Sequence, residues 1–97
     1  MTKMTEAAWS EASLALEAKY MKSFSEAVEW MDTLEWNDKA FQIIAVSRTC
    51  YIGTAAAENA LCDCKTVEEC YTTDTLNIFE AGLEAILQDI QMAYEQR

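Results

Sequence analysis

Residues 37–64 decide the fold, and they read NDKAFQIIAVSRTCYIGTAAAENALCDC. Apolar side chains fall on nearly every face of a helix drawn through this stretch. They are Phe41, Ile43, Ile44, Val46, Cys50, Tyr51, Ile52, Ala55, Ala56, Ala57, Leu61 and Cys62. A helix that is apolar almost all round has to be covered on more than one side. We therefore expect a central helix with longer amphipathic helices packed against it.

The composition of the chain favours an all-α fold. It holds no proline and only two glycines, whereas strand-and-turn folds and loop-rich disulfide scaffolds depend on such turn residues. With 97 residues, of which 52% are hydrophobic, the chain is large enough for one modest core and too small for two. We predict a single helical domain over residues 1–97, arranged as an antiparallel three-helix bundle with short connections.

The first helix is expected to begin near Thr5 and to end before Asn37. Its apolar stripe advances in steps of three or four residues, as one face of a helix does. The stripe comprises Trp9, Ala12, Leu16, Tyr20, Phe24, Ala27, Met31 and Leu34. Ser23 and Glu26 have the spacing of a capping box, which permits a second helix start there. Because the stripe is unbroken, we favour one long helix, with room for a kink near Ser23, over two separate helices.

Asn37 is suited to cap the central helix, which we expect to run from Asp38 to about Cys62. Trp36 and Phe41 occupy the two positions of a hydrophobic staple around that cap. Residues 53–57, GTAAA, give this helix a narrow waist, where small side chains let a neighbouring helix approach closely.

The last helix is expected to start at Thr66, which forms a capping box with Glu69. Polar residues 72–75 compete with the backbone for hydrogen bonds, and a break at Asp74 would divide this helix in two, giving four helices in all. An apolar seam follows, with the spacing that suits packing at about 20° to another helix. Its residues are Leu76, Phe79, Leu83, Ile86, Ile90 and Ala93.

Charge excludes several classes of function. The net charge is −10, and binding to nucleic acid or to anionic membranes depends on Lys and Arg, so we expect neither partner. Histidine is absent, which removes the commonest general base and a common zinc ligand; we expect no enzyme and no cofactor. The N-terminus lacks the pattern of a signal peptide, and no stretch approaches the ~18 apolar residues of a membrane span. These features predict a soluble cytoplasmic protein.

Four cysteines are the weak candidates for metal chemistry. Structural zinc sites usually hold paired ligands two to four residues apart, but the only close pair here is Cys62 and Cys64, with one residue between them. Cys50 would lie roughly 18 Å from Cys62 along the central helix, so a metal could collect only Cys62, Cys64 and Cys70. A disulfide between Cys64 and Cys70 would not persist in a reducing cytoplasm. The simplest interpretation is that these thiols act as small hydrophobic side chains.

An acidic series leads into the central helix at every third residue, with no lysine or arginine among its members. It comprises Glu26, Glu29, Asp32, Glu35 and Asp38. One interpretation is an ordinary solvated face, although such faces usually mix both signs of charge. The other is a surface for a basic partner, with carboxylates standing in for nucleic-acid phosphates. Trp30 lies within the run and off the apolar stripe, and tryptophan is typical of interaction hot spots, so we predict that it binds the partner together with the acidic series.

In size, acidity and expected helical content the chain is similar to small phage and mobile-element inhibitors, such as anti-CRISPR and anti-restriction proteins. That resemblance covers these three properties, and it implies a non-enzymatic protein that docks on a basic, nucleic-acid-binding surface of a larger protein. One alternative is a structural or regulatory module that forms a homodimer through the seam from Leu76 to Ala93. Another is a metal or redox switch at Cys62, Cys64 and Cys70.

Overall fold

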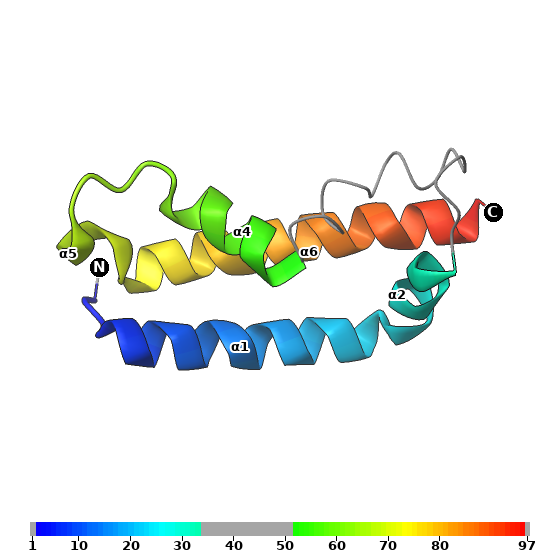
Figure 1. Ribbon diagram of the computed structural model, residues 1–97, viewed down its shortest axis with the longest axis horizontal. Helices are drawn as coiled ribbons and strands as arrows, with labels where there is room; N and C mark the ends of the chain where they lie inside the picture. The colour runs from blue at the N-terminus through cyan, green and yellow to red at the C-terminus, as the bar shows by residue number, and fades with distance from the viewer. Residues whose placement is uncertain (1, 34–51, 97) are drawn as a thin grey trace.

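The computed structural model describes residues 2–33 and 52–96, and these ranges are all-α (Figure 1). Their helices are α1 (Glu6–Ser23), α2 (Ser25–Asp32), α4 (Ile52–Leu61), α5 (Val67–Cys70) and α6 (Thr73–Glu95). The fold class predicted from composition is therefore confirmed. The three-helix arrangement stays a prediction, because residues 38–51 of its central helix lie outside the described ranges. The Asn37 cap and the staple of Trp36 and Phe41 lie outside them as well.

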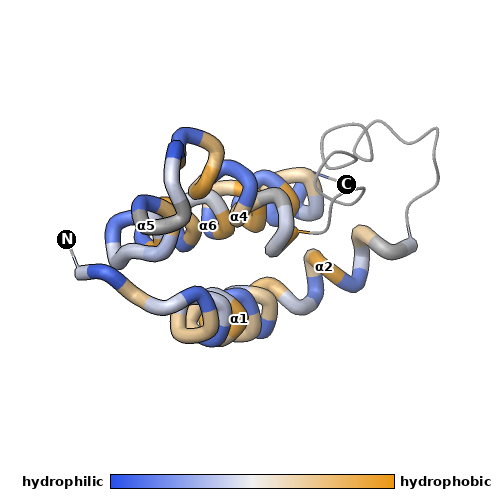
Figure 2. The backbone as a smooth tube through the Cα atoms, turned by 60° about the vertical axis from the view of Figure 1, so that its left-hand side comes forward, coloured by the Kyte–Doolittle hydropathy of each residue, from blue (hydrophilic) through white to orange (hydrophobic). Residues whose placement is uncertain are grey.

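Helix α6 is the central element of the described fold, and α1, α2 and α4 all pack against it. Helices α1 and α6 run in the same direction, and α4 runs in the opposite one (Figure 1). Both views place α1 on one side and α4, α5 and α6 together on the other (Figures 1 and 2). Helices α1 and α4 touch each other at few points, so the space between them is bridged mainly by α6.

The core is built around the apolar seam of α6. Phe79, Leu83 and Ile90 are at most 2% exposed, and Ala93 is also buried, as the spacing of the seam predicts. Leu87, which the predicted seam omits, is fully buried too. The other helices contribute Trp9 from α1, Ala27 and Met31 from α2, and Ile52, Ala56 and Ala60 from α4. Each large apolar side chain buried in this way stabilises the fold by about 1.5–3 kcal/mol.

The first helix is interrupted at Phe24, so the favoured single long helix is wrong and the alternative near Ser23 is right. Phe24 has φ −113° and ψ 22°, outside the helical region, although its N–H still bonds the Tyr20 carbonyl at 3.1 Å. The capping box predicted from Ser23 does not form, because the Ser23 hydroxyl donates to the Lys19 carbonyl at 3.2 Å. Such bonding to the preceding turn bends helices, and the kink brings Phe24 against the core.

The last helix is also divided, at Tyr71 and Thr72 rather than at Asp74. The N-terminal residues pair with this point through an isolated bridge between Lys3 and Thr72. The Met4 N–H donates to the Tyr71 carbonyl at 2.7 Å, so extended backbone replaces the helix there. The predicted Thr66 cap of α5 is confirmed, since its hydroxyl accepts from the Glu69 N–H at 3.3 Å. Glu69 itself accepts from the Lys65 N–H and does not complete a capping box.

Thr72 and Thr75 form the capping box that starts α6, and Thr75 also anchors α1. The Trp9 indole N–H donates to the Thr75 hydroxyl at 3.1 Å across a buried contact. The Trp9 ring meets Tyr71 and Phe79 edge-on, with centroids 5.8 and 5.7 Å away. One aromatic cluster therefore joins the start of α1 to the start of α6.

A polar link joins α1 to α6 further along. The Tyr20 hydroxyl donates to Glu80 Oε1 at 2.9 Å. That hydrogen bond, partial desolvation and the charges of Glu80 and Glu84 raise the pKa of Tyr20 above its ordinary value. None of the helices in the described ranges is both long and apolar enough to cross a membrane.

Candidate functional site

Helix α2 carries the described part of the predicted acidic series. Ala27 and Met31 point into the core, at 0% and 5% exposure, and this orientation leaves Glu26 and Glu29 exposed. Hydrophilic and hydrophobic residues alternate along the helix accordingly (Figure 2). The helix contains no basic residue, so the two carboxylates make its outer side uniformly negative. We call Glu26 and Glu29 the acidic face of α2.

Trp30 is less exposed than the sequence predicts. It is half-buried, and its ring meets Tyr94 of α6 edge-on, with centroids 5.6 Å apart and planes at 68°. Aromatic pairs of this geometry contribute about 0.5–1.5 kcal/mol beyond the area they bury. The first role of Trp30 is therefore to hold α2 against the C-terminal half of α6. Only the remaining exposed part of its ring is open to a partner.

The rest of the predicted partner-binding set is seen only in part. Asp32 is the last residue of α2, but its side chain lies outside what the structure describes, and Glu35 and Asp38 lie outside the described residues. The structure thus gathers Glu26, Glu29 and Trp30 on one short helix. The continuation of the series toward Asp38 stays a prediction.

The three described cysteines lie around the connection between α4 and α5, and all are free thiols. Cys62 is exposed and its thiol donates to the Asn59 carbonyl at 3.1 Å, whereas Cys70 donates to the Thr66 carbonyl at 3.3 Å. A hydrogen bond to Cys70, followed by desolvation and nearby negative charge, raises the pKa of Cys64 from 9.0 to about 11. No group of three or more candidate ligands able to hold a metal occurs within residues 2–33 and 52–96. Cys50 lies outside these ranges.

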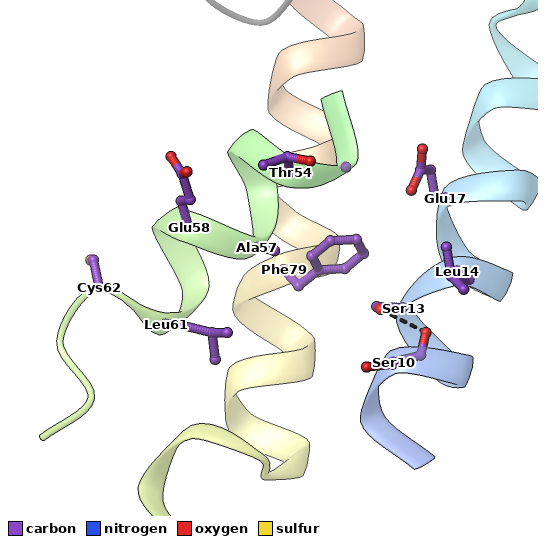
Figure 3. A pocket seen from close by; sticks show the side chains of 11 residues that line it. Ser10, Ser13, Leu14, Glu17, Thr54, Ala57, Glu58, Leu61, Cys62 and Phe79 are labelled. Atoms are coloured by element: carbon purple, nitrogen blue, oxygen red, sulfur yellow. Dashed lines mark hydrogen bonds between the residues drawn. The ribbon is translucent and has the colours of Figure 1, made fainter. Parts of the chain in front are cut away.

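A groove of about 640 Å³ lies between α1 and α4, and no pattern in the sequence predicted it. Its α1 side is formed by Ser10, Ser13, Leu14 and Glu17, as Figure 3 shows. Its α4 side is formed by Gly53, Thr54, Ala57, Glu58 and Leu61, with Cys62 just beyond. Phe79 of α6 lies between the two walls (Figure 3). We call this space the α1–α4 groove.

The α1–α4 groove combines an apolar interior with a negative rim. Leu61 and Ala57 line the interior above the buried Phe79 ring, and Leu14 is 65% exposed at the edge. Among the described residues that line it, the charged ones are Glu17 of α1 and Glu58 of α4.

Small residues of the predicted narrow waist lie where α4 meets its neighbouring helices. On one side of α4, Ala56 packs closely against α6, where a Cβ added to Gly82 would lie 3.9 Å from it. On another side, Gly53 and Ala57 face α1, and a Cβ at residue 53 would collide with the Glu17 carboxylate. The prediction that small residues permit close approach is confirmed toward α6. Toward α1, the Glu17 carboxylate fills the space beside Gly53.

Comparison with known proteins gave no relatives: no family model, no curated protein and no solved structure matches this chain.

Proposed function

We propose that this chain is a non-enzymatic binding protein that docks on a basic, nucleic-acid-binding surface of a larger protein and blocks it, in the manner of anti-CRISPR inhibitors. The observation that carries the proposal is the acidic face of α2. Glu26 and Glu29 stand exposed on a helix without a basic residue. A chain with net charge −10 also steers itself toward basic surfaces, which speeds association.

The packing of α2 supports a role in binding. Ala27 and Met31 fix one side of the helix in the core, and Trp30 fixes it to Tyr94. The two carboxylates therefore stand on a helix that is already held in place before a partner arrives. Holding binding groups in position lowers the entropy lost on association, so the same contacts give a higher affinity.

The experiment is capture of partners from extracts of the native host by the immobilised chain, at low and at physiological salt. We expect a basic protein to be captured, with retention that falls as salt rises. The captured protein is then assayed for nucleic-acid binding with and without the chain, and we expect the chain to compete. Retention that does not change with salt, or binding that leaves the nucleic acid in place, would refute the proposal.

A matched pair of variants assigns the effect to α2. Glu26→Gln with Glu29→Gln removes two negative charges from the acidic face. Glu11→Gln with Asp89→Asn removes two exposed charges from α1 and α6. We expect only the first pair to weaken partner capture strongly. Equal weakening by both pairs would show that net charge alone is responsible, and the acidic face of α2 would lose its role.

The homodimer alternative has lost the surface on which it was based. Leu83 and Ile90 of the seam are 0% exposed within a single chain, and Phe79 is 2% exposed. A self-associating module would have to use a different surface. For the thiol alternative, the influence of Cys70 raises the pKa of Cys64, which disfavours the thiolate that a metal or an oxidant needs.

A further inference from the structure

Helix α1 exposes a continuous row of side chains on the side that faces away from the core. Its buried residues, Trp9 and Ser13, fix which side faces inward. On the other side, positions 7, 11, 14, 18 and 22 follow one another in steps of three and four, so they share one face of the helix. All five residues are exposed. We call this set the outer face of α1, and it comprises Ala7, Glu11, Leu14, Ala18 and Lys22.

The apolar residues of α1 are divided between its two sides. A surface helix normally keeps its apolar residues on the buried side and polar residues on the other. In α1 the outer face carries Ala7, Leu14 and Ala18, and Leu14 is 65% exposed. Helix α1 packs mainly against α6 and lies at the edge of the described fold (Figure 1). One described chain therefore leaves the apolar part of this face uncovered.

The charges on α1 indicate what could cover that face. Among the described helices, α1 alone contains lysine or arginine, whereas the charged residues of the others are all acidic. On the outer face, Glu11 lies toward the N-terminal end and Lys22 lies in the last turn. A uniformly basic partner would be repelled at Lys22, and a uniformly acidic partner at Glu11. A second copy of α1 in the antiparallel direction offers a charge of the opposite sign at both positions.

We infer that two copies of this chain associate through the outer faces of α1, with the two helices antiparallel. Glu11 and Lys22 are eleven residues apart, which is about three turns, so they share a face but stand about 16 Å apart along the axis. They cannot pair within one chain. A two-fold axis between residues 16 and 17 places Glu11 of each copy beside Lys22 of the other. Leu14 then lies beside Ala18 of the second copy, whose small side chain lets the helices approach closely.

The inference goes beyond the proposed function and does not depend on it. The outer face belongs to α1, whereas the proposed partner is bound through α2. Because α2 follows α1 directly, an antiparallel pair of α1 helices would carry one acidic face of α2 near each end. Such a dimer could engage two basic sites at once and hold them more tightly than a single copy. A chain that stays monomeric would leave the proposed function standing.

Sedimentation equilibrium of the full chain measures the association. Concentrations should reach about 1 mM, because a contact between single helices is small and therefore weak. At physiological salt, repulsion between the two net charges is screened beyond about 8 Å, while adjacent charges still interact. We expect the average mass to rise with concentration from the monomer toward the dimer. A mass that stays at the monomer value over the whole range would overturn the inference.

Two variants test the apolar contact. Leu14→Gln removes the exposed leucine of the outer face, and Met92→Gln removes a methionine that is 56% exposed on α6. Both sites are well exposed, so the fold should persist in each, as circular dichroism would verify. We expect Leu14→Gln to raise the dissociation constant of the dimer at least fivefold and Met92→Gln to leave it within twofold of the wild type. Equal effects of the two variants would overturn the inference.

A charge exchange tests the pairing of Glu11 with Lys22. Glu11→Lys makes the chain less negative, so net charge alone would strengthen association. The pairing predicts the opposite, a dissociation constant at least fivefold higher, because lysine would then face lysine. Adding Lys22→Glu to Glu11→Lys restores opposite charges and the net charge of −10, and the double variant should associate within twofold of the wild type. Stronger association of Glu11→Lys, or no recovery in the double variant, would overturn the inference.

Discussion

Replacing Thr75 by valine is expected to destabilise the protein by about 2–4 kcal/mol, although the two side chains have nearly the same shape. The Thr75 side chain is buried, at 8% exposure. Its hydroxyl accepts from the Trp9 indole N–H at 3.1 Å and from the Thr72 N–H at 3.2 Å. It donates to the Cys70 carbonyl at 2.5 Å. Valine would leave all three partners without this hydroxyl.

The magnitude follows from the burial of those partners. Trp9 is 4% exposed and Thr72 is 1% exposed, so water cannot easily replace the missing acceptor. A buried donor left unpaired costs about 1–3 kcal/mol. Two such donors lose their acceptor, and the added apolar methyl group offsets part of that loss, which gives the expected destabilisation. For a chain of this size the change should lower Tm by at least about 8 °C.

Urea unfolding followed by circular dichroism measures the effect, with Thr75→Ser as the matched control. Serine keeps the hydroxyl and loses one methyl group, so it should cost about 0.8 kcal/mol. A Trp9→Phe background removes the indole donor, and valine should then cost at least about 0.5 kcal/mol less than in the wild type. The reasoning fails if Thr75→Val destabilises the protein no more than Thr75→Ser. It also fails if the effects of Thr75→Val and Trp9→Phe on the free energy of unfolding are additive.

Three further substitutions give sharp expectations. Gly82→Ala should raise the free energy of unfolding by about 0.5–1 kcal/mol, since a Cβ there meets Asn59 at 3.5 Å and replaces glycine inside a helix; a loss of stability in urea unfolding would contradict this. Iodoacetamide should modify Cys64 far more slowly than Cys62 at pH 8, because the pKa of Cys64 is raised to about 11, and Cys70→Ala should speed that reaction, as mass spectrometry would show. Since that raised pKa favours the neutral thiol, its stabilising effect is present below pH 9.0 and is lost as the pH rises toward 11. Tyr20→Phe should remove one of the two described tyrosines that ionise late in an ultraviolet pH titration, leaving Tyr71 as the other, and an unchanged titration curve would place the raised pKa of Tyr20 elsewhere.

Local patterns in the sequence predicted the elements well where the physical cause is also local. The steps of three and four along α6 identified Phe79, Leu83 and Ile90 as core, because helix periodicity directly sets which side chains share a face. The Thr66 cap was also predicted correctly, because its cause is equally local. The predicted seam omitted Leu87 because it assigned one core residue to each turn of α6. Since α1, α2 and α4 all pack against α6, a wider part of its surface is buried.

The breaks depended on contacts that no local pattern contains. The end of α5 is set by the pairing of Lys3 with Thr72, residues from opposite ends of the chain. The kink at Phe24 arises where the Ser23 hydroxyl bonds the preceding turn in place of capping the next one. The α1–α4 groove depends on the distance between two helices, which their separate sequences do not specify. Of the candidate site, exposure of Glu26 and Glu29 was predictable from the position of Ala27 and Met31, whereas the contact of Trp30 with Tyr94 was not.

The dependence of α1 on α6 also sets an order of events in folding. The hydrogen bonds that attach α1 span 66 residues at Trp9 and 60 residues at Tyr20, while α4 and α6 are joined by a short connection through α5. Closing the longer loop costs more chain entropy, so the hairpin of α4 and α6 should form first and α1 should dock last. Substitutions at the Trp9 contact should then mainly accelerate unfolding, and those between Ala56 and Gly82 should mainly slow folding. Helix α1, which forms one wall of the groove, should thus be the last part of the described fold to dock during folding and the first to detach during unfolding.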